Sequence, residues 1–117
     1  MGAYWAMAIP HIQSAQAVDV TPFGSNLPAE KTVALFKSEE LEVIRLVLPA
    51  GKAFPAHRVA GEITIQCIEG RLDVTVDGES RPLAAGQLLF LSANLPHSVV
   101  ALEDASALVT IVLHKQG

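Results

Sequence analysis

From Lys31 onward the chain alternates between short apolar runs and short polar breaks. Residues 31–38 (KTVALFKS) and 41–49 (LEVIRLVLP) are rich in β-branched and aliphatic side chains, and a Ser-Glu-Glu break separates them. Residues 63–68 form a third apolar run, and residues 71–77 alternate strictly between polar and apolar side chains. A two-residue period is typical of β-strands with one buried face.

The second half of the chain continues this pattern. Asp77-Gly78 is a strong hairpin signal, and a further turn is predicted at Pro82–Gly86. The uninterrupted apolar run at 88–91 (LLFL) predicts a fully buried strand. Two more strands are predicted at 97–102 and at Ala107–His114. With frequent turn signals and no convincing amphipathic helix, the sequence predicts at least eight antiparallel strands in a sandwich or barrel.

The first thirty residues lack a sustained period. Several are too apolar for free exposure to water: Tyr4, Trp5, Met7 and Ile9. We therefore expect residues 1–30 to pack on the barrel or on a dimer partner, and residues 31–117 to form the barrel domain.

Composition narrows the function classes. At 117 residues the chain is long enough for one domain. Its net charge of −4 does not indicate the basic surface that binding to nucleic acid requires. No apolar run is long enough for a membrane span. A single cysteine rules out an internal disulfide and fits a reducing compartment, so we predict a cytoplasmic protein. The apolar N-terminal segment and the high hydrophobic fraction predict a homodimer.

Two stretches share one sequence pattern, in which a glycine is followed by a histidine beside an apolar run. Gly51–Gly70 carries His57, and Gly86–Val99 carries His97. In spacing, these stretches resemble the two half-motifs of the cupin superfamily. The resemblance covers about residues 31–114, and it implies an all-β fold, an antiparallel double-stranded β-helix or jelly-roll barrel of the RmlC-like type.

The resemblance also implies a site at the barrel mouth, where cupins hold a metal with three imidazoles and a carboxylate. Here His57 and His97 fall on histidine positions, whereas Val59 and Ile63 stand at the positions of the second histidine and the glutamate. Two imidazoles could hold zinc, nickel or copper weakly, as a tentative divalent-metal site. The alternative is that both histidines line a cavity that binds no metal.

Strand alternation predicts which side chains would accompany them. If His57 points inward, the predicted ligand pocket consists of His57, His97, Ile63, Ile65, Cys67 and Val99. A bulge could bring Glu62 or Gln66 inward as an extra metal ligand. Arg58 could clamp a carboxylate ligand, although its place beside His57 favours an outward side chain. Cys67 is expected to behave mainly as a small buried hydrophobe.

Three functional hypotheses follow. The favoured one is a protein that binds a small molecule in the barrel pocket, with or without a weakly held divalent metal. The second is a cupin enzyme, either a metal-independent isomerase or epimerase with His57 or His97 as base, or a metal-dependent dioxygenase or lyase. The third is a non-catalytic dimeric sensor or scaffold. The fold alone does not choose among these three hypotheses. The sequence does not identify the ligand, and the two histidines are candidates for a base only within the second hypothesis.

Overall fold

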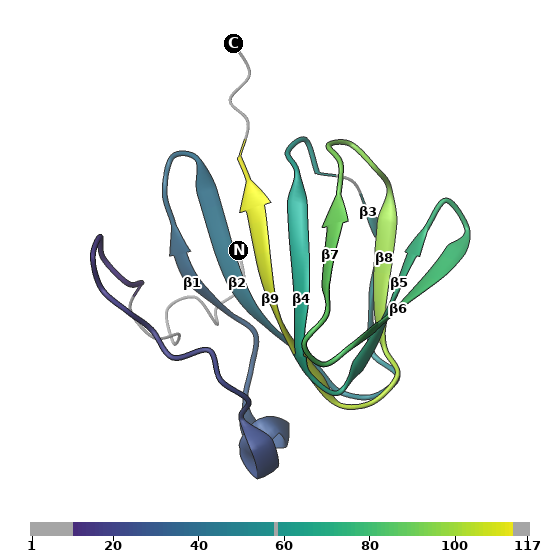
Figure 1. Ribbon diagram of the computed structural model, residues 1–117, viewed down its shortest axis with the longest axis horizontal. Coiled ribbons are helices and arrows are strands. Elements are labelled where there is room, and N and C mark those ends of the chain that lie inside the picture. The colour runs from purple at the N-terminus through teal and green to yellow at the C-terminus, as the bar shows by residue number, and fades with distance from the viewer. Residues whose placement is uncertain (1–10, 58, 114–117) are drawn as a thin grey trace.

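The computed structural model describes residues 11–57 and 59–113, with the backbone but not the side chains of residues 55–57. Two facing β-sheets make up the barrel, and a short 3-10 helix precedes them (Figure 1). The elements are η1 (Gly24–Ala29), β1 (Val33–Lys37), β2 (Leu41–Leu48), β3 (Ala53–His57), β4 (Ile63–Glu69), β5 (Arg71–Val76), β6 (Glu79–Ala84), β7 (Leu88–Leu91), β8 (His97–Ala101) and β9 (Ala105–Val112). No helix in the described ranges has the length and apolarity needed to cross a membrane.

The chain passes repeatedly from one sheet to the other. One sheet has the strand order β1-β2-β9-β4-β7, and the other has the order β3-β8-β5-β6. All paired strands are antiparallel. The predicted all-β, antiparallel jelly-roll architecture is therefore confirmed.

The core lies between the sheets and follows the two-residue period. On β4 the side chains of Ile63, Ile65 and Cys67 are buried, while Gln66 between them is exposed. On the facing sheet, Leu72 and Val74 of β5 are buried in the same cluster. The predicted inward face of β4 is confirmed, because alternate side chains of a strand point to opposite faces.

The predicted hairpin at Asp77-Gly78 is also confirmed. Both residues have positive φ, 52° and 76°, and they join β5 to β6 with Val76 opposite Glu79. Positive φ at both central residues gives a turn whose twist matches that of the flanking strands. Glycine and aspartate accept this conformation more readily than bulky residues do.

The prediction of a fully buried strand at 88–91 is wrong. Leu88 and Phe90 are 63% and 59% exposed, and only Leu91 is buried. Strand β7 is at the edge of the five-stranded sheet, and its outward face is not covered by the described part of the chain. An apolar run shows that both faces are apolar, and it does not show that both are covered.

Three further features differ from the prediction. Strand β3 was not predicted at all, since its short sequence includes a proline. Pro82 belongs to β6 rather than to a turn, which is tolerated because β6 is the edge strand of its sheet. Strand β9 begins at Ala105, two residues before the predicted start.

The described part of the N-terminal segment contacts the barrel. The backbone N–H of Ile12 donates to the carbonyl oxygen of Leu35 on β1, at 3.0 Å. Leu27 of η1 is buried. The apolar residues Tyr4, Trp5, Met7 and Ile9 lie outside the described residues.

Candidate functional site

A cavity of about 200 Å³ lies between the two sheets. Strands β2, β4 and β9 of one sheet and β3 and β8 of the other supply most of its wall. The lining residues among those described are Thr32, Ile44, Leu46, Phe54, Ile63, Ile65, His97, Val99, Val109 and Ile111. The described side chains therefore leave part of the barrel interior unfilled.

The structure brings four of the six predicted pocket residues together at this cavity. They are Ile63, Ile65, His97 and Val99. Cys67 points inward, as predicted, but it is packed in the core and does not line the cavity. Cys67 lies toward the opposite end of β4 from Ile63. An inward side chain at that end of the strand points into the packed core rather than into the cavity.

Several lining residues were not predicted. Ile44 and Leu46 alternate along β2, and Val109 and Ile111 alternate along β9. The same two-residue period that identified Ile63 would have identified these four, given knowledge of which strands border the cavity. Phe54 had no such signal, because its strand was not predicted.

His97 is the lining residue with the most versatile chemistry. It is only 4% exposed, and its Nδ1 lies 3.1 Å from the carbonyl oxygen of Leu95. A ring nitrogen in contact with a carbonyl oxygen must carry a hydrogen, so this contact assigns the proton to Nδ1. In the neutral imidazole the lone pair is then on Nε2. The contact with Leu95 also fixes the orientation of the ring.

His57 lies opposite His97 in the backbone register. The two residues are Cα partners in the pairing of β3 with β8. The side chain of His57 and the whole of Arg58 lie outside the described residues. The register therefore places the two backbone positions predicted for histidine ligands next to each other.

The described residues do not fit a three-histidine, one-carboxylate metal site. Ile63 is buried at the cavity, and Val59 packs against the core, so two of the four ligand positions hold aliphatic side chains. Within the described ranges no three or more His, Cys, Asp or Glu residues are grouped to hold a metal ion.

Glu62 and Gln66 do not supply the missing ligand. Both side chains are exposed, and β4 pairs with β7 in regular register from Ile63 to Gln66. The structure therefore contradicts the hypothesis of a bulge that turns either side chain inward. The irregularity in β4 lies at its other end, between Cys67 and Glu69.

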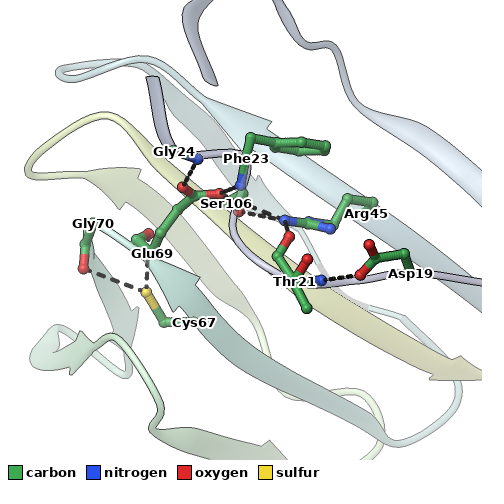
Figure 2. A network of polar contacts seen from close by, with 9 residues as sticks. All are labelled: Asp19, Thr21, Phe23, Gly24, Arg45, Cys67, Glu69, Gly70 and Ser106. Carbon is green, nitrogen blue, oxygen red and sulfur yellow. Dashed lines mark hydrogen bonds and ion pairs between the residues drawn. The ribbon is translucent and has the colours of Figure 1, made fainter. Parts of the chain in front are cut away.

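That irregularity allows a group of polar side chains to meet on the outer face of the five-stranded sheet, away from the cavity (Figure 2). Without it, alternation from Cys67 would turn Glu69 inward. The extra residue in β4 instead places Glu69 opposite Ser106, on the same face as Arg45. Arg45 alternates with the cavity-lining Ile44 and Leu46, so its side chain is on the side of the sheet away from the cavity.

Arg45 is buried, with 3% exposure, and its contacts cross from the sheet to the N-terminal segment. Its Nη2 donates to the carbonyl oxygen of Thr21 at 2.9 Å and to Ser106 Oγ at 3.0 Å. The guanidinium carbon lies 4.1 Å from the centre of the Phe23 ring, within cation–π range. Burial lowers the pKa of Arg45, although the nearby Glu69 carboxylate opposes this effect.

Glu69 completes the group from β4. Its Oε2 accepts hydrogen bonds from Ser106 Oγ and from the backbone N–H of Phe23, and its Oε1 accepts one from Gly24 N–H. Partial burial by itself raises the pKa of Glu69, but these three hydrogen bonds and the charge of Arg45 outweigh it and hold the pKa below its ordinary value. We interpret the group as a structural link, because its partners are residues of the chain itself and none of them lines the cavity.

Cys67 has no chemical role at the cavity. Its Sγ lies 3.5 Å from the carbonyl oxygen of Glu69 and 3.6 Å from that of Gly70. Burial raises the pKa of its thiol, which disfavours the reactive thiolate. The structure agrees with the expectation of a buried hydrophobe.

The comparisons with known proteins concern most of the chain. The family model described as "Cupin domain" matches residues 44–114. No curated protein matches the sequence. Among solved structures, the conserved protein SPY1581 of unknown function from Streptococcus pyogenes is 22% identical, with 92% of this chain and 96% of that chain covered and a TM-score of 0.71.

Two further solved structures are similar. An RmlC-like cupin protein from Desulfovibrio desulfuricans is 27% identical, with 87% of this chain and 97% of that chain covered and a TM-score of 0.64. A mutant of salicylate 1,2-dioxygenase from Pseudoaminobacter salicylatoxidans is 18% identical, with 68% of this chain and 25% of that chain covered and a TM-score of 0.64. At such low identity, the likeness to SPY1581 and to the dioxygenase concerns the fold alone.

Proposed function

This chain belongs to the cupin domain family, and we propose that it binds a small molecule in the cavity between its two sheets. The observation that carries the proposal is the cavity of about 200 Å³, lined by apolar side chains and by the buried His97. A concave, largely apolar space with a few polar groups is the usual form of a small-ligand site. The cavity is smaller than the roughly 300–1,000 Å³ of drug-sized pockets, so the ligand is compact.

His97 supplies the polar contact in this proposal. Its imidazole lines the cavity, and the contact of Nδ1 with the carbonyl oxygen of Leu95 fixes the orientation of the ring. Because the contact holds the ring in place, the bound molecule meets an already oriented group, which lowers the entropic cost of binding.

A weakly held zinc, nickel or copper ion on His57 and His97 remains part of the proposal. Its support is the pairing of the two backbone positions across β3 and β8. Two imidazoles leave most of the coordination sphere to water or to the ligand, so we expect little affinity. Metal content of freshly purified protein, compared with that of the His57→Ala and His97→Ala variants, tests this part.

A second candidate function is metal-independent proton transfer. His97 lines the cavity, and the contact of its Nδ1 with the Leu95 carbonyl oxygen holds the ring in one orientation, as a positioned general base requires. An isomerase or epimerase would use His97 in this way on a substrate with an acidic C–H bond. Turnover that disappears in His97→Asn, with ligand affinity retained, would favour this candidate over binding alone. The hypothesis of a non-catalytic sensor or scaffold does not account for the cavity, because such a role needs no internal space.

The test of the binding proposal is a ligand-observed NMR screen of one-ring compounds, both neutral and charged. The wild-type chain is compared with Val109→Phe, which fills the cavity, and with Val43→Phe. Val43 does not line the cavity and has the same parity on β2 as the outward Arg45. Circular dichroism checks that both variants fold.

We expect binding by the wild type and by Val43→Phe, and its loss in Val109→Phe. Binding that survives equally in Val109→Phe would place the ligand elsewhere and contradict the proposal. The absence of any binding at millimolar concentration across the screen would contradict it as well.

A further inference from the structure

We infer that the ligand of the cavity is an uncharged, hydrocarbon-rich molecule about the size of one substituted ring. This inference rests on the proposed binding function and specifies its ligand class. It follows from the polarity of the cavity wall, from the volume of the cavity and from the position of Phe54.

The described cavity wall offers very little to a polar ligand. Apart from Thr32 and His97, every lining residue among those described is apolar. The hydroxyl of Thr32 is already engaged, because its Oγ1 donates to the carbonyl oxygen of Val47 and accepts from the backbone N–H of the same residue. These bonds are 3.2 Å and 2.9 Å long, so the hydroxyl of Thr32 has no hydrogen left to donate to a ligand.

The polarity of the wall selects against two common classes of ligand. A sugar carries several hydroxyl groups, and each one that is buried without a partner weakens binding. A carboxylate transferred into an apolar space without a compensating charge costs more. No lining residue among those described carries a permanent charge. Besides Thr32, His97 is the one polar side chain on the described part of the wall, so the portion of a ligand that contacts this wall must be mostly hydrocarbon.

Volume sets the size of the ligand. Empty apolar cavities of about 150 Å³ are known to bind benzene. A cavity of about 200 Å³ therefore has room for one six-membered ring with one or two small substituents.

Phe54 marks the entrance. It lines the cavity and is also 39% exposed, so its ring faces both the interior and solvent. It is the Cα partner of Val99, which lies deeper and is buried. A ring in this position contacts the outer part of a bound molecule and favours an aromatic or alicyclic group by stacking or edge contact.

The experiment compares matched pairs of probes on the full chain by ligand-observed NMR titration. Benzamide and benzoate are nearly the same size and differ in charge. Cyclohexanol and glucose both present a six-membered ring and differ in the number of hydroxyl groups. We expect benzamide to bind at least tenfold more tightly than benzoate, and cyclohexanol to bind where glucose does not.

A variant pair tests the entrance. Phe54→Ala is expected to weaken benzamide binding about fivefold, whereas Phe90→Ala, the same change at an exposed position on β7, leaves it unchanged. Equal weakening by both variants would contradict the role of Phe54.

The outcomes separate the ligand class from the binding function. If benzoate binds as tightly as benzamide or more tightly, and Val109→Phe abolishes its binding, the cavity binds ligands but the inferred class is wrong. A carboxylate clamp by Arg58 would then be the first alternative to examine. If no probe binds, both the class and the proposed function fail.

Discussion

Replacing Glu69 with glutamine removes the negative charge from the polar group that joins the N-terminal segment to the five-stranded sheet. The side chain keeps its volume, so the change concerns charge and hydrogen bonding. The carboxylate accepts hydrogen bonds from Ser106 Oγ and from the backbone N–H groups of Phe23 and Gly24. An amide has a single acceptor oxygen, and its NH₂ group would face a donor, so at least one of the three loses its partner.

The expected loss of stability can be estimated from these contacts. A hydrogen bond to a charged group contributes about 1.5–3 kcal/mol and a neutral one about 1 kcal/mol. Losing one charged bond and converting two others to neutral bonds amounts to about 2.5–7 kcal/mol by the same values. The buried guanidinium of Arg45 also loses its counter-ion. Because Glu69 is 14% exposed, water compensates in part, and we expect a decrease of about 3 kcal/mol in the free energy of unfolding.

The pH dependence provides a second check with a definite sign. The pKa of Glu69 is lower in the folded chain than its ordinary value of 4.5. A group with a lowered folded pKa stabilises the fold above its unfolded pKa, and this stabilisation is lost as the pH falls through the folded pKa. Glutamine does not titrate. The stability difference between wild type and Glu69→Gln is therefore full at pH 7 and shrinks below about pH 4.5.

Urea denaturation followed by far-UV circular dichroism, at pH values between 7 and 3, measures both quantities. Glu79→Gln is the matched control, because Glu79 pairs with Arg81 at only 2.8 Å but both side chains are exposed. Exposed pairs contribute about 0–1 kcal/mol, so we expect the control to change stability by less than about 0.5 kcal/mol. Equal effects of the two substitutions, or a difference for Glu69→Gln that does not vary with pH, would refute the reasoning.

Three further predictions concern other parts of the chain. Gly70→Ala is expected to cost above about 3 kcal/mol in chemical denaturation, because φ is +76° and an added Cβ would lie 2.1 Å from a backbone oxygen. Gly51→Ala, at a similar φ of +82° but with open space around it, should cost only about 1–2 kcal/mol, and equal costs would contradict the steric argument. The buried thiol of Cys67 should react with a thiol reagent only after denaturation, so rapid labelling of the native chain would contradict its burial. For the predicted homodimer, we expect light scattering to give twice the monomer mass, and a monomeric wild type would contradict the prediction. If the exposed Leu88 and Phe90 contribute to the dimer interface, the variant with serine at both positions should dissociate.

The local pattern of the sequence determined the strands and their inward faces. Alternation along β4 correctly turned Ile63 and Ile65 toward the interior, and the spacing of glycines and histidines identified the cupin fold. The hairpin at Asp77-Gly78 was equally predictable, because its backbone conformation depends on the two residues themselves. These features depend on the period of the backbone and on residue-specific φ preferences, which are present in the sequence.

Tertiary structure alone decided which faces are covered and which side chains meet. The apolar run of β7 is half exposed because the strand lies at a sheet edge, and a strand's position in a sheet is not encoded in its own residues. Glu69 reaches Arg45 only because an extra residue in β4 reverses the expected alternation, and the N-terminal segment then completes the group. The cavity likewise depends on the separation of two sheets and on side chains from five strands. Such features arise from contacts between residues far apart in the chain, so the two-residue period could indicate candidates for the site but not assemble them.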